Sequence, residues 1–200
     1  MAFIAVMGAL GNVLSWMSTL AAPLTPTVPL GPYSVSIALD LSHVATIIAA
    51  LCGGPLVGGL TGLVGGFVAA VQFGFSKGNL VTGFGLPVGK ALTGIFSGIL
   101  LRSMGPPRRS RNRLVVALIA VLAYVPEAVF TALLFLVVFP LVFGTPSFVL
   151  IPITATILIK AFIELFVVGI LVSGLYGSKG FNLFMGKSAR PTIGQGVSRR

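Results

Sequence analysis

Residues 53–75, GGPLVGGLTGLVGGFVAAVQFGF, carry a small residue at every fourth position. On an α-helix, residues four apart lie on one face, so these small residues form a single stripe. Such a stripe lets two helix backbones approach closely, which favours helix association inside lipid. The pattern therefore predicts a membrane helix that packs tightly against another helix of this chain. The stripe consists of Gly54, Gly58, Gly62, Gly66, Ala70 and Gly74.

Two further segments also carry small residues along one helix face. Residues 85–98 place Gly85, Gly89, Thr93 and Ser97 on one face, with Gly94 and Gly98 beside it. The chain begins with Ala2, Ala5, Ala9 and then Asn12, with Gly8 adjacent. The small face of this first segment could meet another helix of the chain or a helix of a different subunit, and periodicity alone does not choose between them.

The composition places the whole chain in a membrane. Of the 200 residues, 56% are hydrophobic and only 8% are charged, with a mean hydropathy of +1.09. Soluble domains carry about 25% charged residues. Disorder, a secreted disulfide scaffold and a nucleic-acid-binding domain are thereby excluded, and the lone Cys52 has no internal disulfide partner. The net charge of +10 is instead typical of the cytoplasmic flanks of a membrane protein.

The expected fold is an all-α membrane protein, a bundle of six transmembrane helices in one membrane domain of residues 1–178. A span needs about 20 apolar residues, and proline, glycine or charge separates the apolar stretches. Pro126 and Pro140 predict a kink or an early end within the fifth span. A basic cytoplasmic tail follows at residues 179–200, and the predicted spans cover residues 2–22, 35–52, 56–75, 86–104, 114–143 and 149–176.

The basic residues orient these spans. Ten of the thirteen Lys and Arg residues fall between Arg102 and Arg113 or in the tail, so both segments are expected in the cytoplasm, together with both termini. Two alternatives concern the first predicted span and the arginine cluster. A cleaved signal peptide at residues 2–22 would need a basic start, which is missing. The arginine cluster could also bind anionic lipid or a partner protein rather than only set the topology.

Ionisable side chains within predicted spans are functional candidates, because each costs about 3 kcal/mol at the bilayer centre. Lys160 and Glu164 are four residues apart and can form an ion pair on one helix. Glu127 has no partner in its own helix, so it meets Lys90 or Lys160 across the bundle or binds something polar that comes and goes. Tyr124 lies on the same face as Glu127. These residues outline a small-molecule pocket in the outer half of the bundle, with Asn79 at its rim.

Asp40 and His43 begin the second predicted span. Asp40 precedes an apolar run and is a plausible helix N-cap. His43, the single histidine, is expected to have a capping or packing role. No protease nucleophile motif, phosphate-binding loop or metal-ligand spacing was found, so an enzyme, a cofactor and a metal site are not expected.

Three motifs together resemble the substrate-binding S component of energy-coupling factor (ECF) vitamin transporters. They are IAVMGAL at residues 4–10, IALDLSH at residues 37–43 and GGPLVGG at residues 53–59. The resemblance implies a prokaryotic plasma-membrane protein that captures a vitamin or related small metabolite from outside. It also implies a transmembrane T component and two ABC ATPases as partners that drive uptake. In this family a small-xxx-small pair in the first span docks on the T component, and Ala5 and Ala9 match that motif.

The expected substrate contacts are Asn79, Lys90, Tyr124, Glu127, Lys160 and Glu164. Two rival functions stay open. One is a stand-alone secondary transporter or channel subunit that uses the intramembrane Lys and Glu residues as a relay. The other is a membrane enzyme or assembly factor whose Arg-rich loop recruits a soluble partner.

Overall fold

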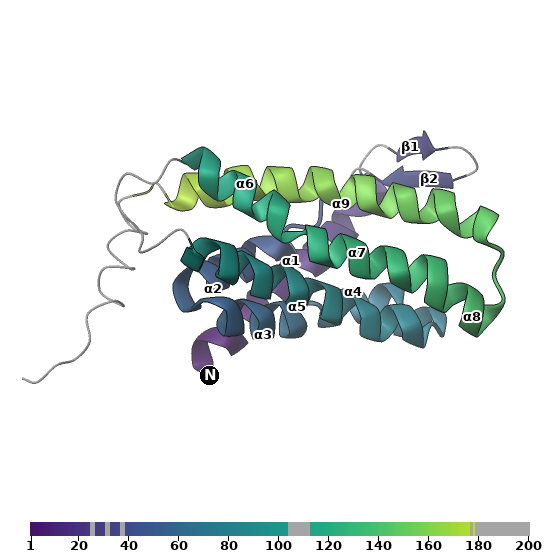
Figure 1. The fold of residues 1–200 in the computed structure, drawn as a ribbon, viewed down its shortest axis with the longest axis horizontal. Coiled ribbons are helices and arrows are strands. Elements are labelled where there is room, and N and C mark those ends of the chain that lie inside the picture. The colour runs from purple at the N-terminus through teal and green to yellow at the C-terminus, as the bar shows by residue number, and fades with distance from the viewer. Residues whose placement is uncertain (25–26, 31–32, 37–38, 104–112, 177, 179–200) are drawn as a thin grey trace, which may run out of the picture.

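The computed structural model describes residues 1–200 except 25–26, 31–32, 37–38, 104–112, 177 and 179–200. Helices dominate the described residues, and one short β-hairpin accompanies them (Figure 1). The elements are α1 (Ala2–Ala21), η1 (Ala22–Leu24), β1 (Thr27–Leu30), β2 (Tyr33–Ser36), α2 (Ser42–Gly53), α3 (Pro55–Gly65), α4 (Phe67–Phe73), η2 (Phe75–Lys77), α5 (Leu80–Ser103), α6 (Arg113–Ala123), α7 (Val125–Leu133), η3 (Leu134–Val138), α8 (Phe139–Phe143) and α9 (Ser147–Tyr176).

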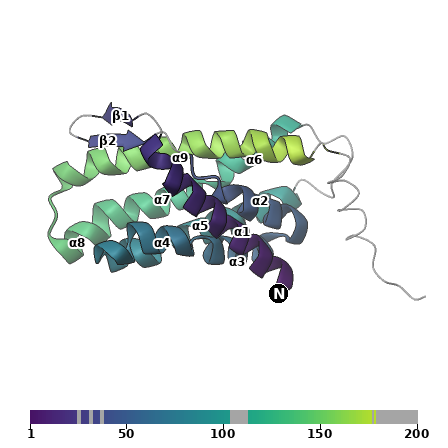
Figure 2. The same ribbon diagram turned by 180° about the vertical axis from the view of Figure 1, so that it is seen from behind.

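The helices lie side by side along one long axis. α3 packs against α5, α6 packs against α9, and α1 crosses over α2 and α3 (Figure 2). The start of α1 and the end of α9 lie at one end of the bundle, whereas the hairpin and the α8–α9 connection lie at the other (Figures 1 and 2). The basic tail and most of the arginine cluster lie outside the described residues, so the cytoplasmic position of both termini stays a prediction.

Five helical stretches of the described chain are long and apolar enough to cross a membrane. They are Ala2–Leu24, Pro55–Lys77, Leu80–Ser103, Leu114–Phe143 and Ser147–Tyr176, close to five of the predicted spans. The remaining expected span, residues 35–52, falls on α2, which has 12 residues and is therefore about 18 Å long. Because the bilayer core is about 30 Å thick, the six-span count is not confirmed.

The predicted start of the second span at residue 35 is wrong. Tyr33–Ser36 forms β2, which pairs antiparallel with β1, and the helix begins only at Ser42. The physical reason is visible in the sequence: Tyr33, Ser34, Val35 and Ser36 alternate between larger and small polar side chains, the period of a strand rather than of a helix.

The predicted small-residue stripe is confirmed as an internal packing surface. A Cβ atom added at Gly58 would lie 2.5 Å from the carbonyl oxygen of Gly94, and one at Gly62 would overlap the carbonyl of Lys90. At Gly66 the added atom would lie 2.7 Å from Cα of Pro87. Glycine along α3 therefore lets the backbones of α3 and α5 touch, and this contact fixes the position of Lys90 in the bundle.

Two long spans are interrupted. The span after residue 113 breaks at Tyr124, and α7 restarts with Pro126 in its first turn, which confirms the kink predicted from proline. The third span breaks at Gly66, between α3 and α4. Asn12 of α1 bridges this break, because its amide donates to the carbonyl of Val64 at 2.8 Å and accepts the N–H of Val68 at 2.9 Å.

Candidate functional site

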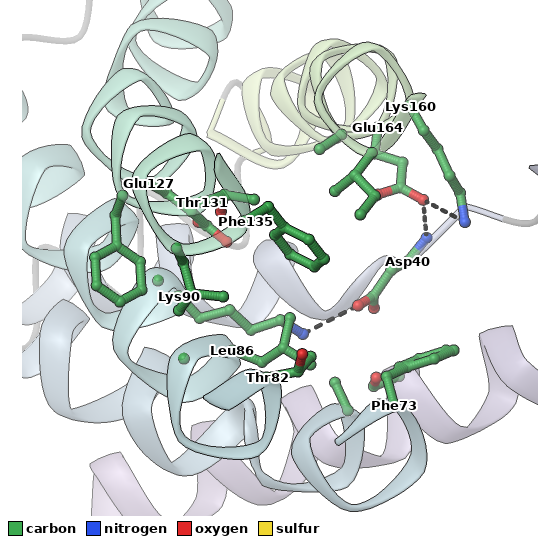
Figure 3. Close-up of a pocket in the computed structure, with 18 of the residues that line it drawn as sticks. Asp40, Phe73, Thr82, Leu86, Lys90, Glu127, Thr131, Phe135, Lys160 and Glu164 are labelled. Carbon is green, nitrogen blue, oxygen red and sulfur yellow. Dashed lines mark hydrogen bonds and ion pairs between the residues drawn. The ribbon is translucent and has the colours of Figure 1, made fainter. Parts of the chain in front are cut away.

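A cavity of about 510 Å³ lies between the helices. Side chains from α1, α4, α5, α7, α9 and the start of α2 line it (Figure 3). All the predicted substrate contacts belong to its lining, namely Asn79, Lys90, Tyr124, Glu127, Lys160 and Glu164. The six predicted contacts, which extend over 85 positions of the sequence from Asn79 to Glu164, thus line one cavity.

Lys90 is held by two groups at the amino end of α2. Its ammonium lies 3.0 Å from Oδ2 of Asp40 and donates a hydrogen bond to the hydroxyl of Ser42. Lys90 is buried, with 4% of its surface exposed. Lys90 lies near the middle of α5. Its backbone carbonyl packs so closely against Gly62 of α3 that an added Cβ at Gly62 would overlap it. The sequence predicted a functional lysine here but did not identify Asp40 as its partner.

Lys160 and Glu164 form the ion pair that the i, i+4 spacing predicted. Nζ of Lys160 lies 3.5 Å from Oε1 of Glu164 (Figure 3). The same Oε1 accepts the backbone N–H of Asp40 at 3.0 Å. Asp40 therefore connects α5 to α9, because its side chain binds Lys90 while its backbone binds Glu164.

Asp40 lies in the connection before α2, and its carboxylate has several neighbours. Oδ1 accepts the N–H of Ser42 at 2.9 Å, so it satisfies a free donor at the helix start as predicted, although Leu41 occupies the N-cap position. Burial raises the pKa of this carboxyl, but the Lys90 ammonium, His43 and the Ser42 hydrogen bond together hold it below its usual range. Asp40 is therefore ionised and paired.

Glu127 has a different environment. Of the two predicted alternatives, an ion pair with Lys90 or Lys160 is not found among the described residues, because no lysine there lies within ion-pair distance of the carboxylate. The other alternative, a polar ligand, stays a prediction. Oε2 accepts a hydrogen bond from Thr93, and Oε1 lies 4.0 Å from Nε2 of His43. Gly89 on α5 provides the space, since a Cβ there would come within 3.3 Å of Oε1.

Tyr124 and Asn79 lie at different levels of the cavity. Tyr124 is 2% exposed and packs edge-on against Phe162, with ring centroids 5.0 Å apart. Asn79 lies just before α5, where its Oδ1 accepts the N–H of Thr82 at 3.0 Å. About ten residues of α5, or roughly 15 Å, separate Asn79 from Lys90. Asn79 is thus well separated from Lys90, whereas Tyr124 precedes Glu127 by three residues; the rim position of Asn79 stays a prediction.

Two groups of lining residues were not among the substrate contacts predicted from the sequence. His43 was assigned a packing role, yet it lines the cavity beside Glu127, and its Nδ1 has no hydrogen-bond partner among the described residues. The sequence signal available for this group was the rarity of acidic residues: the chain has three. All three line this cavity. The second group consists of the phenylalanines of the lining, Phe73, Phe130, Phe135 and Phe139. The sequence pattern does not distinguish them from phenylalanines that face lipid.

The cavity supplies charged groups, hydroxyls and aromatic faces, but the described residues contain no group of three or more His, Cys, Asp or Glu side chains arranged to hold a metal ion. Ala5 and Ala9 lie elsewhere, exposed on the outer face of α1. A neighbouring face of α1 packs inward, because Gly8 and Gly11 lie against Val64 and Gly65. The two small-residue faces of α1 therefore have different neighbours.

A family model described as "ECF transporter, substrate-specific component" matches residues 1–172. The chain belongs to this family. An ECF substrate-specific component is a multi-pass membrane protein and a substrate-binding transporter subunit, not a member of an enzyme family. Membership implies a small-molecule substrate and T-component and ATPase partners. No curated protein matches the chain.

Proposed function

We propose that this ECF substrate-specific component captures a vitamin-like metabolite from outside the cell in the cavity between α5, α7 and α9. A T component and two ABC ATPases then drive uptake. In this proposal six lining residues contact the substrate or support those contacts, namely Asn79, Lys90, Tyr124, Glu127, Lys160 and Glu164. The observation that carries the proposal is the 510 Å³ cavity, because it gathers every acidic residue of the chain with three of its lysines, Lys77, Lys90 and Lys160.

Size and polarity support a small organic substrate. Ligand pockets of this kind enclose about 300–1,000 Å³ and combine apolar walls with a few polar groups that fix orientation. The cavity has that character: phenylalanine side chains form much of its wall, and the charged groups lie between α5, α7 and α9. Buried charges that the membrane environment would otherwise disfavour are then retained because they bind substrate.

Native mass spectrometry of the purified chain tests capture directly. We expect a co-purifying metabolite that is absent after exhaustive unfolding and refolding, and its mass would name the substrate. Coexpression with candidate T components and ATPases should yield a complex that imports this metabolite with ATP. Uptake by the chain alone in liposomes would contradict the proposed dependence on ATPases.

The Lys160→Met variant tests the site. We expect binding of the co-purified metabolite to weaken at least tenfold by isothermal titration, because the ammonium beside Glu164 is lost. Lys160→Arg keeps the charge and should retain most of the affinity. Arg102→Met removes a cation outside the cavity lining and serves as the control. Unchanged affinity in a folded Lys160→Met protein would remove this residue from the site.

One observation favours a second function. Lys160, Glu164, Asp40 and Lys90 form a continuous polar chain across the bundle through the contacts described above. Such a chain could serve as a proton or ion relay in a stand-alone secondary transporter. Transport by the lone chain that depends on a proton gradient would favour this alternative.

A further inference from the structure

The chemistry of the captured molecule follows from the way the cavity distributes its charges. We infer that the substrate presents a protonated nitrogen, or a planar group rich in N–H donors, to Glu127. This inference rests on the proposed function, since it assigns the substrate class of the same cavity. Amidinium, guanidinium and aminated heterocycles have this chemistry.

The first argument is the pairing of the charges. Asp40 already lies 3.0 Å from Lys90, and Glu164 lies 3.5 Å from Lys160, so each of these acids has a lysine partner. Among the described residues, His43 is the one group able to carry positive charge that lies within ion-pair distance of Glu127, at 4.0 Å. A carboxylate buried to 8% exposure is costly without a partner. Among the charged groups of the cavity, Glu127 is therefore the one with capacity for a cationic or N–H donor ligand.

The second argument is the free acceptor on Glu127. Oε2 is used by Thr93, whereas no described residue donates a hydrogen bond to Oε1. Glu127 lines the cavity, and the glycine at position 89 keeps the space beside Oε1 clear. His43 is 5% exposed, its Nε2 lies 4.0 Å from this oxygen, and its Nδ1 has no hydrogen-bond partner among the described residues. A donor group from a ligand would satisfy Oε1 as no side chain does.

The third argument is the surface next to Glu127. Phe130 and Thr131 follow Glu127 at i+3 and i+4 on α7, so they share its face and also line the cavity. An aromatic face beside a carboxylate suits a flat cation, which gains from both the charge and the ring. Beside Glu127 an anionic group has no such place, because Lys90 and Lys160 are each engaged by a carboxylate. The third lysine of the lining, Lys77, belongs to η2 and lies over the ring of Phe73, not next to Glu127.

Three probes of one shape and different charge test this inference: benzamidine, benzamide and benzoate. Each is added to the purified full chain in detergent, and binding is followed by ligand-observed NMR and by thermal unfolding. We expect benzamidine to bind at least tenfold more tightly than benzoate, with benzamide between them. Benzamidine should also displace the co-purified metabolite.

Glu127→Gln should weaken benzamidine binding at least tenfold and leave benzoate unchanged. Val129→Leu, on the exposed side of the same helix, should leave binding of all three probes unchanged. If Glu127→Gln does not fold, Gly89→Ala provides a second test, since its methyl group would crowd Oε1 and weaken benzamidine binding.

Preferred binding of benzoate, equal affinities of benzamidine for the wild type and folded Glu127→Gln, or no response to any probe would each overturn the inference. The proposed function would survive those results if a metabolite still co-purifies and is imported with the ATPases. Conversely, benzamidine binding at Glu127 without any transport complex would refute the proposed function alone.

Discussion

Asp40 holds together parts of the chain that are far apart in the sequence. Its carboxylate binds Lys90 of α5 and the first N–H of α2, and its own N–H binds Glu164 of α9. One residue thereby sets the spacing of three helices around the cavity. In a low-dielectric interior such charge-assisted hydrogen bonds are stronger than in water, and an unpaired member is costly.

Removing Lys90 should expose that cost. Lys90→Met leaves the Asp40 carboxylate without its cation, so we expect the free energy of unfolding in detergent to fall by about 3 kcal/mol. The double variant Asp40→Asn/Lys90→Met should recover part of this loss, because no unpaired charge remains. Denaturant titration followed by tryptophan fluorescence of Trp16 measures both. If the Lys90→Met protein were as stable as the wild type, Asp40 and Lys90 would not be energetically coupled.

At the scale of residues, the sequence identified functional side chains by their rarity but not by their partners. Lys90, Glu127, Lys160 and Glu164 were found because an ionisable group within an apolar run needs a reason. Only the Lys160–Glu164 contact could be predicted, since both residues share one helix. The Asp40–Lys90 contact joins residues 50 positions apart, and such a distance in sequence gives no local signal.

At the scale of elements, the contact between α3 and α5 is built on glycine. The backbone of each helix occupies the place where the other would carry a side chain, at Gly58 and Gly94 for example. Close backbone approach maximises van der Waals contact where apolar burial gives no net gain. The same contact positions Lys90, so packing and site geometry depend on each other here.

Gly62→Ala tests this dependence. The new methyl group would overlap the carbonyl of Lys90, so we expect a loss of about 1 to 2 kcal/mol in stability even though alanine favours helices. Metabolite binding should weaken as well, because Lys90 must move. Gly174→Ala, where an added Cβ meets nothing within 4 Å, is the matched control and should be neutral or slightly stabilising. Equal stability of both variants would contradict a tight α3–α5 contact.

Elements were predictable where the apolar run was long and its period was helical. The glycine stripe predicted the third span, and Pro126 predicted the break before α7. The hairpin was missed because four-residue strands at Thr27–Leu30 and Tyr33–Ser36 are too short to stand out beside a following apolar run. The break at Gly66 was also missed, since it depends on Asn12 of another helix to bind the freed backbone groups.

At the scale of the whole molecule, the proposed substrate site lies apart from Ala5 and Ala9, where the sequence predicts attachment to a T component. The cavity lies inside the bundle, whereas Ala5 and Ala9 lie exposed on the outer face of α1. Neither alanine lines the cavity. Substrate capture and attachment to a T component can therefore be perturbed independently.

The double variant Ala5→Leu/Ala9→Leu makes this separation measurable. Two bulky side chains would keep a partner helix from close approach, so we expect at least a tenfold loss of co-purifying T component. Binding of the metabolite to the purified chain should be unchanged. Val129→Leu on the outer face of α7 should leave both properties unchanged. If the Ala5→Leu/Ala9→Leu protein still co-purified with the T component, the docking surface would lie elsewhere.

The clustering of the acids also has a practical side. Within these 200 residues all three side-chain carboxyl groups border a single chamber. Among the side chains of these 200 residues, a carbodiimide that labels carboxyl groups would therefore mark that chamber. Protection from such labelling could report occupancy in intact membranes, before any cargo has been named and whatever subunits surround the chain.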